Sequence, residues 1–257
     1  MNLIDSHCHL DASEFDLDRA AMLARSFAAG VTRWVVPGIT AASMDKTRAM
    51  RQQYGAEIAL GLHPIYEPEH SELSLQQLRG ALDLGEAIAV GEIGLDFYLP
   101  DLNHERQIYF FEAQLKIARD FDLPVIVHIR RSQDQVLKYL RKWRVKGGIA
   151  HAFNGSEQQA NAFIQLGFCL GFGGALTYSG SQRIRRLAAT LPLSSLVLET
   201  DAPDMVPSWL AGTPPQRNEP AELAKIAVEL AALRGMDVAD LAEACTQNTQ
   251  RVLLLGA

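Results

Sequence analysis

The amino-acid sequence predicts an α/β fold, a TIM-type (β/α)8 barrel that occupies residues 1–257 as one domain. Three observations predict it. Short apolar segments alternate with helical patterns eight times along the chain. The length of 257 residues matches the roughly 250 that such a barrel needs. Several apolar segments also end in a histidine or a carboxylate, and a barrel of parallel strands brings strand ends from a whole chain to one point.

The strand candidates are short and apolar on both faces, as expected for strands buried in a parallel sheet. They are Leu3–His9, Arg33–Pro37, Glu57–His63, Ala87–Glu92, Val125–His128, Gly148–His151, Phe168–Gly171 and Leu196–Thr200. Barrel enzymes place their active sites at the carboxyl ends of such strands, so we expect the functional side chains there.

Helical patterns lie between these segments, and a glycine often follows the pattern, as is typical of a helix C-terminus. The expected helices are Leu17–Ala29, Ala41–Tyr54, Leu75–Leu84, His104–Phe121, Ser132–Arg144, Ser156–Leu166 and Gln182–Leu191. After a proline-rich loop at 203–220, the tail predicts the eighth helix and one or two extra C-terminal helices.

Composition and charge set limits on the function. The hydrophobic share of 48% and the charged share of 21% are typical of a globular enzyme and exclude disorder. The net charge of −6 excludes attraction to nucleic acid by the whole surface. Three widely spaced cysteines indicate a reducing compartment, and we find neither a signal peptide nor an apolar span. We therefore expect a cytoplasmic monomer without a membrane association or an obligate protein partner.

Six side chains at the ends of predicted strands indicate a metal centre. They are His7, His9, Glu92, His128, His151 and Asp201. In a His-x-His segment both imidazoles point to one face of the strand, because the side-chain period is two. A buried polar role explains any one of these residues more simply than a metal does. Packing, however, does not account for four histidines and two acids that all end strands.

We expect two divalent cations about 3.5–4 Å apart, and the oxygen and nitrogen ligands suit Zn, Mg, Mn, Ni or Co. The expected ligands are His7, His9 and Asp201 for one cation and His128 and His151 for the other. Glu92 lies between the two groups and is expected to bridge them. A water activated by both cations would attack the substrate, and Asp201 would take its proton.

Three further residues are candidates for substrate binding. His63 ends a predicted strand in Gly61-Leu-His-Pro, and we expect it to donate to a phosphate or another oxyanion during catalysis. Arg130 and Arg217 follow the fifth and the eighth strand, where an arginine can reach a substrate anion. The alternative for both arginines is a solvated position in a loop.

Other polar residues have less definite roles. Glu199 shares a strand face with Asp201 and is either a partner of a ligand or a site for a further ion. His70 lies in an acidic segment, and we expect it to be solvated. The basic run Arg141–Lys146 comes before the sixth strand, at the far rim of the barrel, and is also expected to be solvated rather than to bind nucleic acid.

Seven motifs between residues 4 and 220 form a specific combination. They are Ile4-Asp-Ser-His-Cys-His-Leu-Asp11, Gly61-Leu-His-Pro64, Gly91-Glu-Ile-Gly-Leu-Asp-Phe-Tyr98, Pro124-Val-Ile-Val-His-Ile-Arg130, His151-Ala-Phe-Asn-Gly155, Leu198-Glu-Thr-Asp-Ala-Pro203 and Arg217-Asn-Glu-Pro220. This combination resembles the TatD-type metal-dependent hydrolases, a branch of the amidohydrolase-like barrels. The resemblance implies two or three divalent metals, DNase activity that depends on magnesium or manganese, and the same six ligands. Glu92 stands where the wider group often has a carbamylated lysine, which argues against a urease-like mechanism.

The sequence therefore predicts a metal-dependent hydrolase, a phosphodiesterase or deoxyribonuclease that acts on DNA ends. The alternative is a hydrolase of small esters, amides or lactones that uses the same pair of cations, and the sparse basic surface favours it. A third hypothesis, a metal-binding protein without catalysis, conflicts with the intact ligand set.

Overall fold

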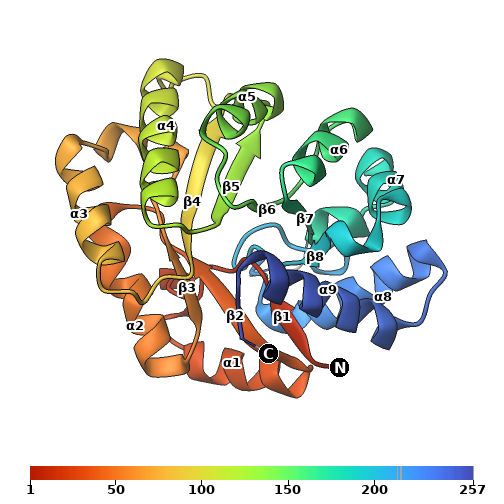
Figure 1. Ribbon diagram of the computed structural model, residues 1–257. Helices are drawn as coiled ribbons and strands as arrows, with labels where there is room; N and C mark the ends of the chain where they lie inside the picture. Colours follow the sequence, from red (N-terminus) through yellow and green to blue (C-terminus); the bar gives the residue numbers. More distant parts are fainter. Residues whose placement is uncertain (213, 215, 257) are drawn as a thin grey trace.

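The computed structural model describes residues 1–212, 214 and 216–256, and these residues form eight parallel strands that pair in chain order (Figure 1). The strands are β1 (Leu3–Asp5), β2 (Val31–Pro37), β3 (Glu57–Leu60), β4 (Ala89–Asp96), β5 (Val125–Arg130), β6 (Gly148–Ala150), β7 (Phe168–Phe172) and β8 (Leu196–Leu198). The alternation of strands and helices confirms the predicted barrel.

The helices surround the sheet on its outside (Figure 1). They are α1 (Arg19–Ala28), α2 (Met44–Tyr54), α3 (Glu72–Leu82), α4 (His104–Asp120), α5 (Gln133–Trp143), α6 (Glu157–Gln165), α7 (Gln182–Thr190), α8 (Leu223–Arg234) and α9 (Val238–Val252). None of the helices in the described ranges is long and apolar enough to cross a membrane. The proline-rich loop at 203–220 includes positions 213 and 215, which lie outside the described residues.

Residues just beyond the first and last strands bring β8 next to β1. The Ser6 amide donates to the Leu198 carbonyl at 3.0 Å. The fully buried Asp5 carboxylate accepts from the Thr200 amide at 3.0 Å and from its hydroxyl at 2.5 Å. Burial raises the pKa of Asp5 to about 7. These contacts fix the segments that carry the functional residues of the first and last strands.

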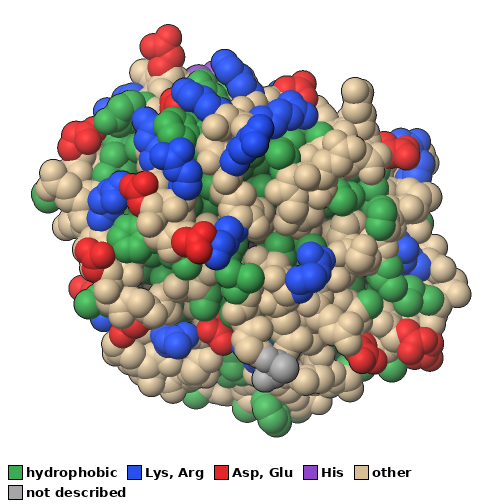
Figure 2. Space-filling view, viewed as in Figure 1, with side chains coloured by type: hydrophobic (Ala, Val, Ile, Leu, Met, Phe, Trp, Pro, Cys, Tyr) green, Lys and Arg blue, Asp and Glu red, His purple; other side chains and the backbone are tan. Residues whose placement is uncertain are grey.

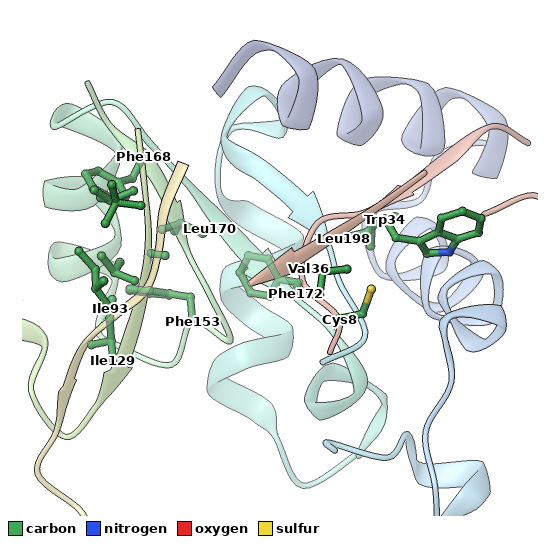
Figure 3. Packing of buried hydrophobic residues seen from close by; sticks show 14 of the residues in the cluster. Cys8, Trp34, Val36, Ile93, Ile129, Phe153, Phe168, Leu170, Phe172 and Leu198 are labelled. Atoms are coloured by element: carbon green, nitrogen blue, oxygen red, sulfur yellow. The ribbon is translucent and has the colours of Figure 1, made fainter. Parts of the chain in front are cut away.

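The interior of the barrel is filled by one buried side chain from each strand. These side chains are Ile4, Val35, Ala59, Ala89, Ile126, Ile149, Cys169 and Val197, and Val252 and Leu253 at the end of α9 pack against them. A larger cluster lies between the strands and the helices, and Figure 3 shows part of it, including Ile93 and Phe168. Because apolar side chains fill the interior of the barrel, the polar groups lie at its mouth, which is formed by the carboxyl ends of the strands and the loops that follow them.

Strand lengths differ from the prediction at the mouth. Four strands end earlier than expected: β1 at Asp5, β3 at Leu60, β6 at Ala150 and β8 at Leu198. In contrast, β4 continues past Glu92 to Asp96. The loops that follow the short strands curl over the mouth, so most of the predicted ligands lie in loops rather than in the sheet itself.

Charged side chains of both signs are spread over the surface, and Figure 2 shows lysines and arginines concentrated in the upper part of that view, where Figure 1 places α4 and α5. In the basic run, Arg141, Lys142 and Arg144 are exposed at the end of α5, as expected for a solvated segment. Trp143 between them is half-buried. Lys142 is paired with Glu112.

Candidate metal centre

The structure brings all six predicted ligands, and His63, to the mouth of the barrel. Glu92 lies within β4 and His128 within β5, whereas the others follow β1, β3, β6 and β8. Three overlapping groups have possible ligand atoms within 4.8 Å of one another: His7, His9 and Asp201; His7, Glu92 and His151; and His63, Glu92 and His128. The grouping differs from the expected one because His63, rather than His151, is the histidine beside His128 and Glu92.

The buried Glu92 carboxylate lies at the centre of these groups. Its Oε2 is 3.1 Å from Nε2 of His7 and 3.7 Å from Nε2 of His9. Its Oε1 is 3.1 Å from Nε2 of His63 and 3.0 Å from Nδ1 of His128. Burial alone would raise the pKa of Glu92, but the surrounding histidines hold it well below its usual range. The two oxygens thus face different histidines, which is what a bridging carboxylate requires.

Asp201 completes the first group from the loop after β8. Its Oδ1 is 3.5 Å from Nε2 of His7 and 3.6 Å from Nε2 of His9. Its amide donates to the His7 carbonyl at 2.9 Å, and its φ of 56° lies in the left-handed region, which aspartate tolerates better than most residues. Burial raises the pKa of Asp201 to about 6.

His128 is oriented by Asp96, a residue for which no role was predicted from the sequence. Oδ2 of Asp96 is 3.0 Å from Nε2 of His128. A carboxylate in this position holds the ring proton on Nε2 and leaves the Nδ1 lone pair directed toward Glu92. At Gly94, with a φ of 149°, a Cβ would lie 2.0 Å from the His128 carbonyl oxygen. Glycine therefore permits the close approach of β4 and β5 that brings Asp96 to His128.

His151 has a similar partner in Glu199. Nδ1 of His151 is 3.1 Å from Oε1 of Glu199, and the same oxygen accepts from the Ala152 amide at 2.6 Å. A Cβ at Gly171 would lie 2.0 Å from Oε2 of Glu199, so a glycine makes room for this buried carboxylate. Of the two roles considered for Glu199, its position favours that of a partner to a ligand. Nε2 of His151 is left facing the mouth.

His63 differs from the other histidines of the site in its hydrogen bonds and its pKa. Its Nδ1 accepts from the Ile65 amide at 3.2 Å, and burial lowers its pKa to about 4. The neutral ring therefore carries its proton on Nε2, which suits a hydrogen-bond donor better than a metal ligand. The expectation that His70 is solvated was wrong. His70 is buried against Phe110, and its Nε2 donates to the His63 carbonyl at 2.9 Å, because the segment after β3 folds back over α4.

The donor set fits divalent cations. Both ring nitrogens of His7 are buried and have no hydrogen-bond partner among the described residues. Such unpaired buried nitrogens are costly in a folded protein, and a metal ion would satisfy one of them. Imidazoles and carboxylates without thiolates suit zinc, manganese and related ions.

Two cavities meet at this centre, and both are lined by His128, Arg130, His151 and Asp201. The first, which we call the acidic lobe, has a volume of about 490 Å³. Its further lining includes Asp11, Glu14, Asp204, Ile65 and Tyr66. The second, which we call the arginine groove, has a volume of about 850 Å³. Its further lining includes Tyr98, Arg131, Gln133, Asn154, Gln159 and Arg183.

The two predicted substrate arginines differ in position. Arg130 lines both cavities, and its side chain is half exposed. Arg217 is among the described lining residues of neither cavity. Its guanidinium forms two hydrogen bonds with Asp18, at 2.7 and 2.8 Å, and a third with the Glu14 carbonyl at 2.8 Å. The structure therefore does not bring Arg217 to the mouth, because its charge is already paired with an acid near the start of α1.

Known proteins with the same sequence pattern place the chain in a family. Residues 4–254 match the family described as TatD related DNase. The metal-dependent hydrolase YjjV of Escherichia coli, which is described as uncharacterized, is 42% identical over 250 residues, or 96% of this chain and 95% of YjjV. A crystal structure of YjjV has a TM-score of 0.93 at 40% identity and 97% coverage of both chains. A protein of Cronobacter sakazakii named 3'-5' ssDNA/RNA exonuclease TatD is 33% identical over 260 residues, with 99% coverage of both chains. The chain therefore belongs to the TatD-related DNase family and is a metal-dependent hydrolase.

Proposed function

We propose that the chain hydrolyses phosphodiester bonds at the ends of single-stranded DNA or RNA, with two divalent cations held at the mouth of the barrel. The observation that carries the proposal is the Glu92 carboxylate, whose two oxygens face two different sets of histidines. A cationic groove is lined by His128, His151 and Asp201 of the same centre and suits a phosphate chain. Relatives named as 3'-5' ssDNA/RNA exonucleases, at 30% and 33% identity, support the choice of substrate.

The ligands would be divided between the two cations by Glu92. His7, His9 and Asp201 would hold one cation. His128 and His151 would hold the other, because Nδ1 of His128 and Nε2 of His151 lie 3.0 and 3.9 Å from Oε1 of Glu92. His63, next to them, would remain a hydrogen-bond donor. When bound, the cations neutralise phosphate charge and lower the pKa of a water molecule so that it can attack at neutral pH. Zinc, magnesium, manganese, nickel and cobalt are all compatible with these ligands.

Asp201 is the side chain best placed to accept a proton from the attacking water. It lines both cavities and is the more exposed of the two central carboxylates, at 15% against 2% for Glu92. Burial raises its pKa to about 6, close to neutral pH, where proton transfer is efficient.

His63 and Arg130 would hold the scissile phosphate. The proton on Nε2 of His63 points toward Oε1 of Glu92 and can be donated to a non-bridging oxygen placed beside it. Arg130 lies at the junction of the two cavities and carries a fixed positive charge. Both groups would bind the phosphate more strongly as its negative charge increases in the transition state.

The test is cleavage of an end-labelled single-stranded oligonucleotide by protein that has been stripped of metal and then supplied with Mg²⁺ or Mn²⁺. We expect cleavage to return with the metal and to be absent in Glu92→Gln. Glu105→Gln, which changes an exposed carboxylate on α4 outside both cavities, is the matched control and should retain activity. Metal-restored cleavage that persists in Glu92→Gln would overturn the proposal.

The acidic lobe favours a second candidate, the hydrolysis of a small ester, amide or lactone. Six carboxylates line this lobe: Asp11, Glu14, Glu92, Asp96, Asp201 and Asp204. Such a wall disfavours a polyanion in that lobe and accepts an uncharged group more readily. Turnover of carbonyl substrates, without turnover of phosphodiesters by the same metal-loaded protein, would favour this candidate.

A further inference from the structure

The arginine groove extends away from the metal ligands and has a different charge from the acidic lobe. Among its described lining residues, Asp201 is the only carboxylate, and Arg130, Arg131 and Arg183 supply three positive charges. In the acidic lobe, Lys46 and Arg130 are the fixed cations against six carboxylates. A negatively charged chain that crosses the metal centre is therefore attracted to one side and repelled from the other.

Arg183 is held in the groove by a neutral side chain. Its Nε and Nη2 donate to Oδ1 of Asn154 at 3.1 and 2.6 Å. Asn154 is in turn fixed because its carbonyl accepts from the Gln133 side chain at 2.7 Å. An amide acceptor orients the guanidinium without cancelling its charge. In contrast, Arg217 is paired with a carboxylate and lies outside both cavities.

Arg131 is held at the groove by an aromatic ring. The guanidinium carbon of Arg131 is 4.7 Å from the centre of the Tyr98 ring, and that of Arg130 is 3.8 Å from it. Such contacts restrain a guanidinium and leave its charge available to a ligand. Within the described ranges, neither Arg131 nor Arg183 has a carboxylate within salt-bridge distance, and both are exposed.

We propose that the arginine groove binds the phosphates next to the scissile phosphate, and that Arg131 and Arg183 select a nucleotide chain over a small phosphodiester. This inference rests on the proposed phosphodiesterase function and adds the part of the substrate that is not cleaved. Each arginine binds one flanking phosphate. Tyr98 positions the guanidinium of Arg131, and Asn154 that of Arg183. The uncharged end of the nucleotide chain lies in the acidic lobe. Neither arginine contacts the reacting atoms, so both act on substrate binding.

The experiment compares wild type with Arg131→Ala/Arg183→Ala on two substrates, a single-stranded decanucleotide and bis(p-nitrophenyl) phosphate, which has no flanking phosphate. We expect the KM for the decanucleotide to rise by about tenfold for each charge-assisted hydrogen bond that is lost. The kcat and KM for the small diester should not change. Arg186→Ala, an exposed arginine on α7 outside the groove, is the matched control, and Arg131→Lys/Arg183→Lys should restore part of the affinity.

A second readout needs no turnover. Fluorescence anisotropy of the labelled decanucleotide in EDTA measures its affinity at several salt concentrations. The slope of log affinity against log salt should fall by about 0.7 for each arginine removed. An unchanged decanucleotide KM and salt slope in the double variant, or an equal loss on both substrates, would overturn the inference. If wild type cleaves no phosphodiester, the proposed function fails, whereas the salt slope still decides whether the groove binds a phosphate chain.

Discussion

Oδ2 of Asp96 lies 3.0 Å from Nε2 of His128, and the other nitrogen of the same ring lies 3.0 Å from Oε1 of Glu92. The imidazole thus connects a carboxylate behind it to the carboxylate at the centre of the site. The second nitrogen of His128 is available to a cation only while Asp96 keeps the proton on Nε2.

Asp96→Asn should weaken the binding of one of the two cations by about 10–100-fold, because the amide no longer stabilises the required form of the His128 ring. Titration of the metal-free protein with Zn²⁺ against a competing chelator measures this affinity. Asp101→Asn, which changes an exposed aspartate in the loop after β4, is the control. Equal affinities in Asp96→Asn and the control would show that Asp96 does not orient a ligand.

His63→Gln should retain both cations and lose activity by about 10²-fold, as expected when a donor in the transition state is removed. Its neutral ring carries the proton on Nε2 because Nδ1 accepts from the Ile65 amide. Metal content and kcat are measured on the same preparation. Loss of one cation from His63→Gln would instead identify this residue as a ligand.

Cation binding should release protons at neutral pH. Burial would lower the pKa of His151, but Glu199, Asp201 and Glu92 raise it to about 10. The ring is therefore protonated below that value and must lose its proton before Nε2 can bind a metal, so affinity should decrease as the pH falls from 10 toward 7. Calorimetry of Zn²⁺ binding at pH 7 in buffers of different ionisation enthalpy counts the protons released. A count of zero would contradict a ligand role for His151.

Arg217→Ala should leave the kcat and KM on any substrate unchanged. Its guanidinium is bound to Asp18, and both side chains are partly exposed, so loss of this ion pair should lower the free energy of unfolding only slightly. Steady-state kinetics and urea unfolding check the two parts of the prediction. A rise in KM in the variant would show instead that Arg217 contributes to substrate binding.

The fold, and the gathering of the six candidate ligands at one mouth, were predictable from the sequence for a simple reason. Alternation of buried strands and helices leaves few topologies, and a parallel barrel gathers the residues that follow its strands whatever the details of the loops. His7, His9 and Asp201 could be placed together in this way even though β1 and β8 end earlier than expected.

The remaining features depend on contacts between residues far apart in the chain. Asp96 reaches His128 because β4 continues four residues beyond Glu92, and His70 is buried because the segment after β3 folds against Phe110. Asp18 and Arg217 are 199 residues apart, and no local pattern predicts their pairing. Arg131 follows β5 and Arg183 lies in the first turn of α7, and no local pattern connects them, so the groove that they line is visible only in three dimensions.

We propose that one carboxylate, Glu92, joins two cation sites. The most direct measurement is the metal content of wild type and Glu92→Gln after loading with Zn²⁺ and dialysis, by elemental analysis, with circular dichroism to confirm folding. If Glu92 bridges two cations, wild type should hold two ions per chain and both sites should be weaker in the variant, because each site loses an oxygen ligand. A single ion per chain in wild type, or two ions retained in folded Glu92→Gln, would contradict it.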